Sequence, residues 1–84
     1  MSKHQLVFYE VPHTWREARL PMHASALERG IFDVINHEGA ATLTYLTEAL
    51  RDQYNAAGWQ IADAANHLVS MGALELRNVT HNRL

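Results

Sequence analysis

The amino-acid sequence predicts a small α+β domain in which three helices share one core with a small antiparallel sheet. Three segments place apolar residues at helical spacing, and a strand-like run lies toward each end of the chain. The 84 residues contain no repeat or flexible linker, and the 48% hydrophobic and 19% charged residues are typical of a globular chain. We therefore expect one domain over residues 1–84.

The first expected element is a strand over residues 6–11. The letters LVFYEV form a dense β-branched and aromatic run that stops at Pro12. Thr14 lies three residues before Glu17, a spacing that predicts a short helical turn over residues 14–19, interrupted by Pro21. Residues 1–22 should form an N-terminal strand and an arm.

The first long helix is expected over residues 24–37. Ser25 is a suitable N-cap with Glu28 three residues later, and Gly39 is a suitable residue just beyond the C-terminus. The apolar residues Leu27, Ile31, Val34 and Ile35 form the stripe of a helix that packs on one side.

A short strand, AATL, is expected to precede a second helix that Thr44 caps. Asn55 can end this helix in a left-handed conformation. One face of the helix carries Leu43, Leu46, Leu50 and Tyr54.

A turn over residues 56–58 should lead into a third helix over residues 59–71, which Gly72 ends. Its apolar stripe consists of Ile61, Ala65, Leu68 and Met71. The following ALELR alternates as a strand does, with Leu74 and Leu76 on one face and Glu75 and Arg77 on the other.

Residues 27–77 resemble the winged-helix domains of small bacterial, phage and plasmid regulators. The matching text is GIFDVINHEGAATLTYLTEAL followed by WQIADAANHLVSMGALEL. The resemblance implies a winged-helix-like three-helix core with a helix-turn-helix over residues 24–77 and a tail over residues 78–84. Because only NVTHNRL follows Arg77, we expect the second wing strand to be truncated or replaced by the N-terminal strand.

The resemblance also implies a DNA-binding transcription regulator whose third helix enters the major groove. Gln60 and Asn66 are residue types that can each contact adenine through two hydrogen bonds. Arg77 and Arg83, with Lys3, Arg16 and Arg19 at the other end, would attract the phosphates. The predicted DNA-binding residues are Trp59, Gln60, Asp63, Asn66, His67, Arg77 and Arg83. A homodimer would double these contacts.

The charge distribution opposes this function. Residues 52–76 contain no Lys or Arg, the net charge is −2 and the isoelectric point is about 6.3, whereas nucleic-acid-binding domains usually have a basic face. The polar residues of the third helix could equally be a solvated surface.

The alternative is the same scaffold serving in protein interaction or inhibition, without DNA binding. Exposed aromatic side chains often anchor protein interfaces, and the candidates for such a partner surface are Trp15, Trp59, Tyr45 and Tyr54. Each of them could instead cover the edge of the small core.

We expect no enzyme activity, no cofactor, no metal and no small-molecule substrate. HEGAA at residues 37–41 lacks the second histidine of a zinc-protease motif, and no cysteine is present. No phosphate-binding loop or nucleophile motif occurs. The short apolar run near the N-terminus is too short for a signal or a membrane span, so a cytoplasmic protein is expected.

Overall fold

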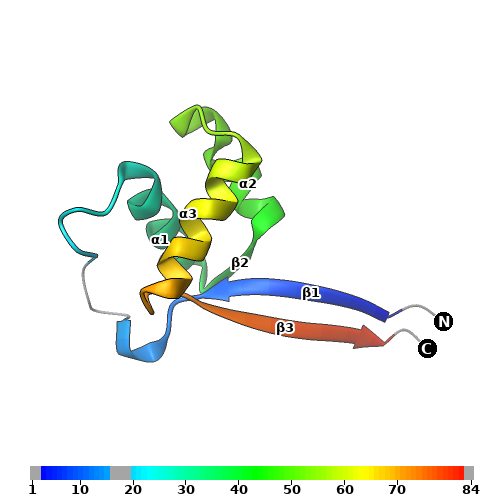
Figure 1. Ribbon diagram of the computed structural model, residues 1–84. Helices are drawn as coiled ribbons and strands as arrows, with labels where there is room; N and C mark the ends of the chain where they lie inside the picture. Colours follow the sequence, from blue (N-terminus) through cyan, green and yellow to red (C-terminus); the bar gives the residue numbers. More distant parts are fainter. Residues whose placement is uncertain (1–2, 16–19, 83–84) are drawn as a thin grey trace.

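Over the residues that the structure describes, 3–15 and 20–82, the chain has three α-helices and a three-stranded antiparallel sheet (Figure 1). The structure is a computed structural model. Its elements in chain order are β1 (Lys3–Glu10), a 3-10 turn (His13–Trp15), α1 (Ala26–Glu38), β2 (Ala40–Thr42), α2 (Leu43–Tyr54), α3 (Gly58–Ser70) and β3 (Glu75–Asn82). The α+β class is confirmed, and the element order is consistent with the winged-helix-like arrangement expected from the sequence.

The N-terminal strand lies in the middle of the sheet, whose order is β2-β1-β3. β1 pairs with β3 along its whole length, from Lys3 opposite Asn82 to Glu10 opposite Glu75. β2 pairs with the other edge of β1 over residues 8–10. The N-terminal strand is therefore the partner of β3, which agrees with one of the two alternatives that the sequence left open.

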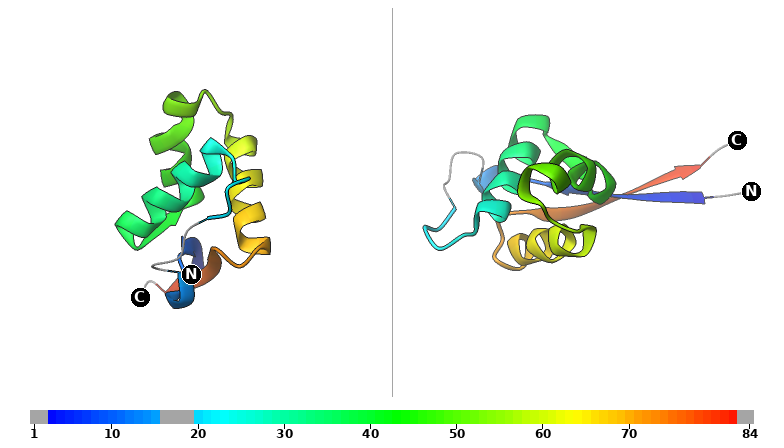
Figure 2. Two further views of the ribbon diagram at one scale, coloured as in Figure 1. Left: turned by 90° about the vertical axis from the view of Figure 1, so that its left-hand side faces the viewer. Right: turned by 90° about the horizontal axis from the view of Figure 1, so that it is seen from above.

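β1 and β3 are both longer than the sequence pattern indicated. The predicted strand over residues 6–11 is Lys3–Glu10, and residues 78–82, expected to be a short tail, continue β3. The backbone pairing of β1 with β3 explains the difference. Each strand supplies hydrogen-bond partners for the backbone of the other, so polar residues without a strand-like sequence pattern are also held in the sheet. The paired strands form a ribbon that runs away from the helices, with both chain ends at its tip (Figures 1 and 2).

The first helix begins and ends where its local sequence indicates. Ser25 Oγ accepts a hydrogen bond from the Glu28 backbone N–H, and a Glu28 carboxylate oxygen accepts one from the Ser25 backbone N–H. Gly39, with φ of 93°, follows the last turn. The prediction of a helix over residues 24–37 is confirmed to within two residues.

The second helix begins two residues earlier than expected. Thr42, and not Thr44, is the N-cap, because Thr42 Oγ1 accepts a hydrogen bond of 3.1 Å from the Tyr45 backbone N–H. The short strand β2 leads directly into this cap. Asn55 ends α2 in the left-handed region, with φ of 48°, as expected.

The third helix, Gly58–Ser70, begins and ends one residue before the predicted bounds. Gly72 follows its last turn with φ of 89°. The predicted helical turn over residues 14–19 is a 3-10 turn over His13–Trp15, and its remainder, residues 16–19, lies outside the described residues.

The three helices and the sheet share one hydrophobic core. The sheet contributes three buried side chains to this core: Tyr9 and Ala41, which lie opposite each other on β1 and β2, and Leu74 just before β3. Each fully buried Leu or Ile stabilises the fold by about 1.5–3 kcal/mol. The helices contribute completely or almost completely buried side chains at Ile31, Ile35, Leu46, Leu50, Ile61, Ala65 and Leu68.

Gly30 allows α1 to approach the end of α2 closely. A Cβ atom on Gly30 would lie 2.5 Å from the hydroxyl oxygen of Tyr54 and 2.7 Å from its Cζ atom. Both distances are shorter than any unstrained contact. A residue that is unfavourable inside a helix is therefore required here by packing.

We predict that Gly30→Ala lowers the free energy of unfolding by about 1–3 kcal/mol, because the overpacked ring must move. This is the net effect, because the cost of moving the ring should exceed the gain of about 1 kcal/mol that alanine brings in helix propensity. In a Tyr54→Ala background the same change should be neutral or stabilising. Urea denaturation of the four proteins measures both effects, and equal effects of Gly30→Ala in both backgrounds would exclude the Tyr54 contact as the cause.

Candidate recognition surface

The five α3 residues predicted from the sequence lie on the exposed side of that helix. Ile61, Ala65 and Leu68 turn the opposite side into the core. We call the exposed set the α3 outer face; it consists of Trp59, Gln60, Asp63, Asn66 and His67.

Trp59 is the largest apolar side chain on this face and is 68% exposed. It lies in the first turn of α3, where no side chain of the N-cap residue Ala57 covers the helix end. Leaving this much aromatic surface in water contributes nothing to the fold. Tryptophan in such a position is typical of the anchor of a protein interface.

Gln60 completes the start of α3. Its Oε1 accepts a hydrogen bond of 2.7 Å from the backbone N–H of Ala57. Ala57 cannot cap the helix with its own side chain, so Gln60 satisfies one of the backbone groups left free there. The oxygen of this amide thus already accepts one hydrogen bond, while its NH₂ group remains a donor.

Asn66 joins α3 to the central strand. The Tyr9 hydroxyl donates a hydrogen bond of 3.2 Å to Asn66 Oδ1. The ring of Tyr9 is buried, and this burial raises the pKa of its hydroxyl. Tyr9 therefore stays a neutral donor, and Asn66 gives it the polar partner that a buried tyrosine needs.

These two contacts change what the amides offer to a ligand. Bidentate recognition of adenine uses the amide oxygen as acceptor and the NH₂ group as donor. In Gln60 and Asn66 the oxygen already accepts an intramolecular hydrogen bond. Both side chains thus support the fold, a role that the sequence reading did not assign to them.

His67 contacts a buried carboxylate from the first helix. Its Nδ1 pairs with one carboxylate oxygen of Glu28, whose other oxygen accepts from the Ser25 backbone N–H. Glu28 is the buried charged residue of the described core. Burial by itself would raise the pKa of Glu28, but the hydrogen bonds from His67 and Ser25 outweigh it and hold the pKa below 4.5.

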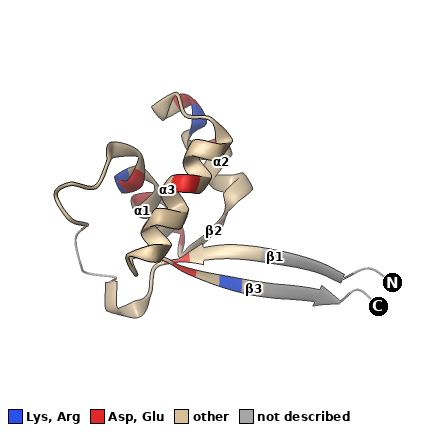
Figure 3. Cartoon of the chain, viewed as in Figure 1, with Lys and Arg blue, Asp and Glu red and all other residues tan. Residues whose placement is uncertain are grey.

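The electrostatic character of the α3 outer face is neutral to acidic. Asp63 is the one Asp, Glu, Lys or Arg residue in α3, and Figure 3 shows red but no blue on this helix. The carboxylate of Glu28 lies beside His67 beneath the surface. This helix therefore attracts cationic groups more readily than phosphates.

The arginines with described side chains are all engaged within the molecule. Arg77 on β3 lies 3.2 Å from the Glu10 carboxylate, and Arg29 donates a hydrogen bond of 2.7 Å to the carbonyl oxygen of Pro21. Arg51 lies 3.8 Å from Asp52. The predicted contact Arg83 lies outside the described residues, as do the side chains of Lys3, Arg16 and Arg19.

The other aromatic candidates for a partner surface occupy different places. Trp15 is half-buried, and its ring meets Phe32 edge to face with centroids 6.4 Å apart. Tyr54 is half-buried against Gly30. Tyr45 is 45% exposed and lies beside Phe8 at the edge of a groove. Trp15 and Tyr54 thus cover the core, whereas Tyr45 remains available.

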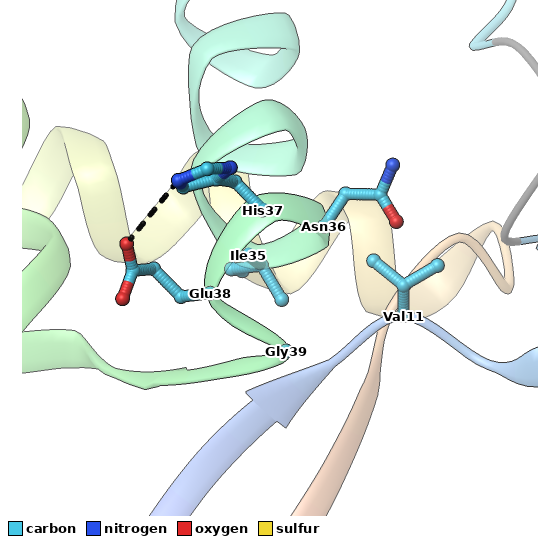
Figure 4. A pocket seen from close by; sticks show the side chains of 6 residues that line it. All are labelled: Val11, Ile35, Asn36, His37, Glu38 and Gly39. Atoms are coloured by element: carbon cyan, nitrogen blue, oxygen red, sulfur yellow. Dashed lines mark ion pairs between the residues drawn. The ribbon is translucent and has the colours of Figure 1, made fainter.

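Two grooves flank the C-terminal end of α1. The first, of about 300 Å³, is lined by Val11, Ile35, Asn36, His37, Glu38 and Gly39 (Figure 4). The second, of about 280 Å³, lies between the sheet and the start of α2 and includes Phe8, Thr42 and Tyr45. The sequence pattern pointed to neither, because their walls come from segments that are distant in the chain.

The described part of the chain offers no group of three His, Asp or Glu side chains that could hold a metal ion. None of the helices described has the length and apolar character needed to cross a bilayer. Comparisons with family models, curated proteins and solved structures gave no match.

We predict that Asn66→Ala and Tyr9→Phe each lower the free energy of unfolding by about 0.5–1.5 kcal/mol. The first variant removes the acceptor of the hydrogen bond between the two side chains, and the second removes its donor. The double variant should cost less than the sum of the two. A double-mutant cycle by urea denaturation measures the coupling. Strict additivity would show that the bond between α3 and β1 contributes no stability.

We predict a second effect in acid. The pKa of Glu28 is lowered in the folded state, so its ionised form stabilises the fold at pH values above the ordinary pKa of 4.5. That contribution is lost as the pH falls through the lowered pKa of the folded state. Glu28→Gln should therefore be less stable than the wild type at neutral pH, and the difference should shrink on acidification.

Urea denaturation over a pH series tests this prediction, with Glu38→Gln as a matched control on the surface of the same helix. The control should follow the wild-type curve. A difference between Glu28→Gln and the wild type that stays constant into acid would contradict the role given to the carboxylate.

Proposed function

We propose that the chain is a non-enzymatic module that binds a protein partner through the α3 outer face, with Trp59 as the anchor. The observation that carries this proposal is the 68% exposure of Trp59 on a helix without Lys or Arg. Tryptophan is the residue type most enriched among interface hot spots.

The chemistry of the face specifies the partner. Asp63 lies one helical turn after Trp59 and is exposed. A partner that offers an apolar pocket for the indole and a cationic group beside it would complement both side chains. The NH₂ groups of Gln60 and Asn66 add donors at the rim, and their oxygens each already accept one hydrogen bond within the fold.

DNA binding as a regulator remains the second candidate. It is favoured by α2 and α3, which follow one another across the short turn at residues 55–57 as in a helix-turn-helix. It is opposed by the acidic character of α3, because phosphate contacts supply much of the affinity in such complexes. The Arg77 guanidinium, the described candidate for a phosphate contact on β3, is paired with Glu10.

The first experiment identifies the partner. A photoreactive phenylalanine analogue is placed at position 59 or at position 22 in the expressed chain, and the cells are irradiated. Met22 is 96% exposed and lies outside α3, so it is a matched control. A discrete protein adduct from position 59 that is missing from position 22 is the expected result.

We predict that Trp59→Ala then weakens binding of that partner by about 30-fold or more, the effect of losing about 2 kcal/mol at a hot spot. Asp63→Lys should weaken binding by removing the charge complement. Met22→Ala should have no effect. Isothermal titration with the purified partner measures all three variants, and circular dichroism checks that they fold.

The DNA candidate predicts the opposite result for Asp63→Lys, which should strengthen DNA binding, whereas it should weaken binding of a protein partner. Titration of mixed-sequence duplex at low salt should detect no binding. Binding that is present there, that weakens with Trp59→Ala and that strengthens with Asp63→Lys would overturn the protein proposal, since an added cation helps only phosphate recognition.

A further inference from the structure

The outer edge of β3 is an open strand edge. β3 runs for eight residues, and within the described residues only β1 pairs with it. The pairing with β1 continues residue by residue without a bulge. The sequence ELRNVTHN contains no Pro and no Lys. Proteins normally protect exposed edges by those devices, because an open edge pairs with another strand.

The far half of the ribbon has little support from the rest of the chain. β2 reaches β1 only at residues 8–10, so beyond that point the described sheet has two strands. The last described pair of this ribbon is Lys3 opposite Asn82. A two-stranded ribbon in water is marginally stable, and additional strands stabilise it.

One face of the ribbon also exposes apolar side chains. Val7 is 41% exposed and Leu76 is 48% exposed. Leu76 lies opposite Tyr9, and Val7 lies two residues before Tyr9, so both are on the same face as that buried residue. A wider sheet would give these side chains lateral neighbours.

We propose that β3 pairs with β3 of a second copy of this chain, antiparallel and about a two-fold axis centred on Asn78. Antiparallel pairing of identical edges is self-complementary, as a two-fold interface requires. The result is a continuous six-stranded sheet of order β2-β1-β3 in one copy followed by β3-β1-β2 in the other. The backbone groups of both open edges gain partners.

The charges select the register. Directly opposed residues of an antiparallel pair lie on the same face, so the axis passes through a residue and not between two. The two registers that overlap most of β3 are centred on Asn78 and Val79. Centring on Asn78 puts Glu75 opposite the histidine position 81, whereas centring on Val79 puts Arg77 opposite that position. Only the first places a carboxylate, and not a guanidinium, opposite that histidine position.

The arrangement has a consequence for the α3 outer face. Rotation about a two-fold axis perpendicular to the sheet does not turn the sheet over. The helices of both copies therefore lie on the same side of the six-stranded sheet. The ribbon carries the pairing edge away from the helices (Figure 2). The dimer therefore carries both α3 outer faces on the helical side of the sheet, and it forms whether or not Trp59 binds a partner.

The mass of the protein in solution gives the first measurement. Light scattering after size exclusion should give twice the chain mass of 9.5 kDa. Asn78 is exposed, so Asn78→Lys should leave the fold intact and produce a monomer, because the two lysines meet at the axis. Gln53→Lys, an exposed site on α2, is the matched control and should stay dimeric. A monomeric wild type, or a dimeric Asn78→Lys, overturns the proposal.

Charge pairing tests the position of the axis. Asn78→Asp should also be monomeric, and an equal mixture of Asn78→Lys and Asn78→Asp should form a heterodimer, because only a residue on the axis meets itself. Failure of the mixture to associate overturns the register. Trp59→Ala should remain dimeric, so loss of partner binding and loss of the dimer are separate outcomes.

A covalent test does not depend on the stability of the charged variants. The chain has no cysteine, so Asn78→Cys introduces a single thiol. Opposed residues of an antiparallel pair have Cα atoms about 4.5–5.5 Å apart, within the range that a disulfide spans. Mild oxidation should link most of Asn78→Cys into a dimer and little of Gln53→Cys. Equal crosslinking of the two variants contradicts the proposed interface.

Discussion

The antiparallel pairing of β1 with β3 is the constraint on which the rest of the structure depends. It brings the two ends of the described chain together and makes the N-terminal strand the centre of the sheet. The other edge of β1 then receives β2, which leads directly into α2. Tyr9, on the core-facing side of β1, holds α3 through Asn66. One strand thus connects the sheet to the helix with the candidate recognition surface.

A second connection joins the helices through a buried charge. The Glu28 carboxylate stabilises the start of α1 through Ser25 and contacts His67 on α3. A buried carboxylate without such partners would be costly, and with them its ionised form is favoured. Three of the polar residues on the α3 outer face, Gln60, Asn66 and His67, are therefore partly structural. Trp59 and Asp63 have no such contact among the described residues.

The two proposed surfaces follow from different physical causes. The α3 outer face stands out because a large apolar side chain remains in water on a helix without cations. The β3 edge stands out because backbone groups remain open along a straight strand. The first selects a partner by side-chain chemistry, and the second selects a copy of the chain by symmetry. The two proposals together describe a bivalent module, which would gain affinity for a partner with repeated sites.

The sequence by itself determined the helices, because caps and apolar spacing are local. Ser25, Asn55 and Gly72 stand where the pattern put them, and the errors, such as Thr44 for Thr42, are of one or two residues. The exposed side of α3 was predictable for the same reason. Only the tertiary structure decided which strands pair and what Gln60, Asn66 and His67 contact, because Asn66 meets Tyr9 57 residues away and His67 meets Glu28 39 residues away. Such contacts depend on how the elements pack, and no local pattern encodes them.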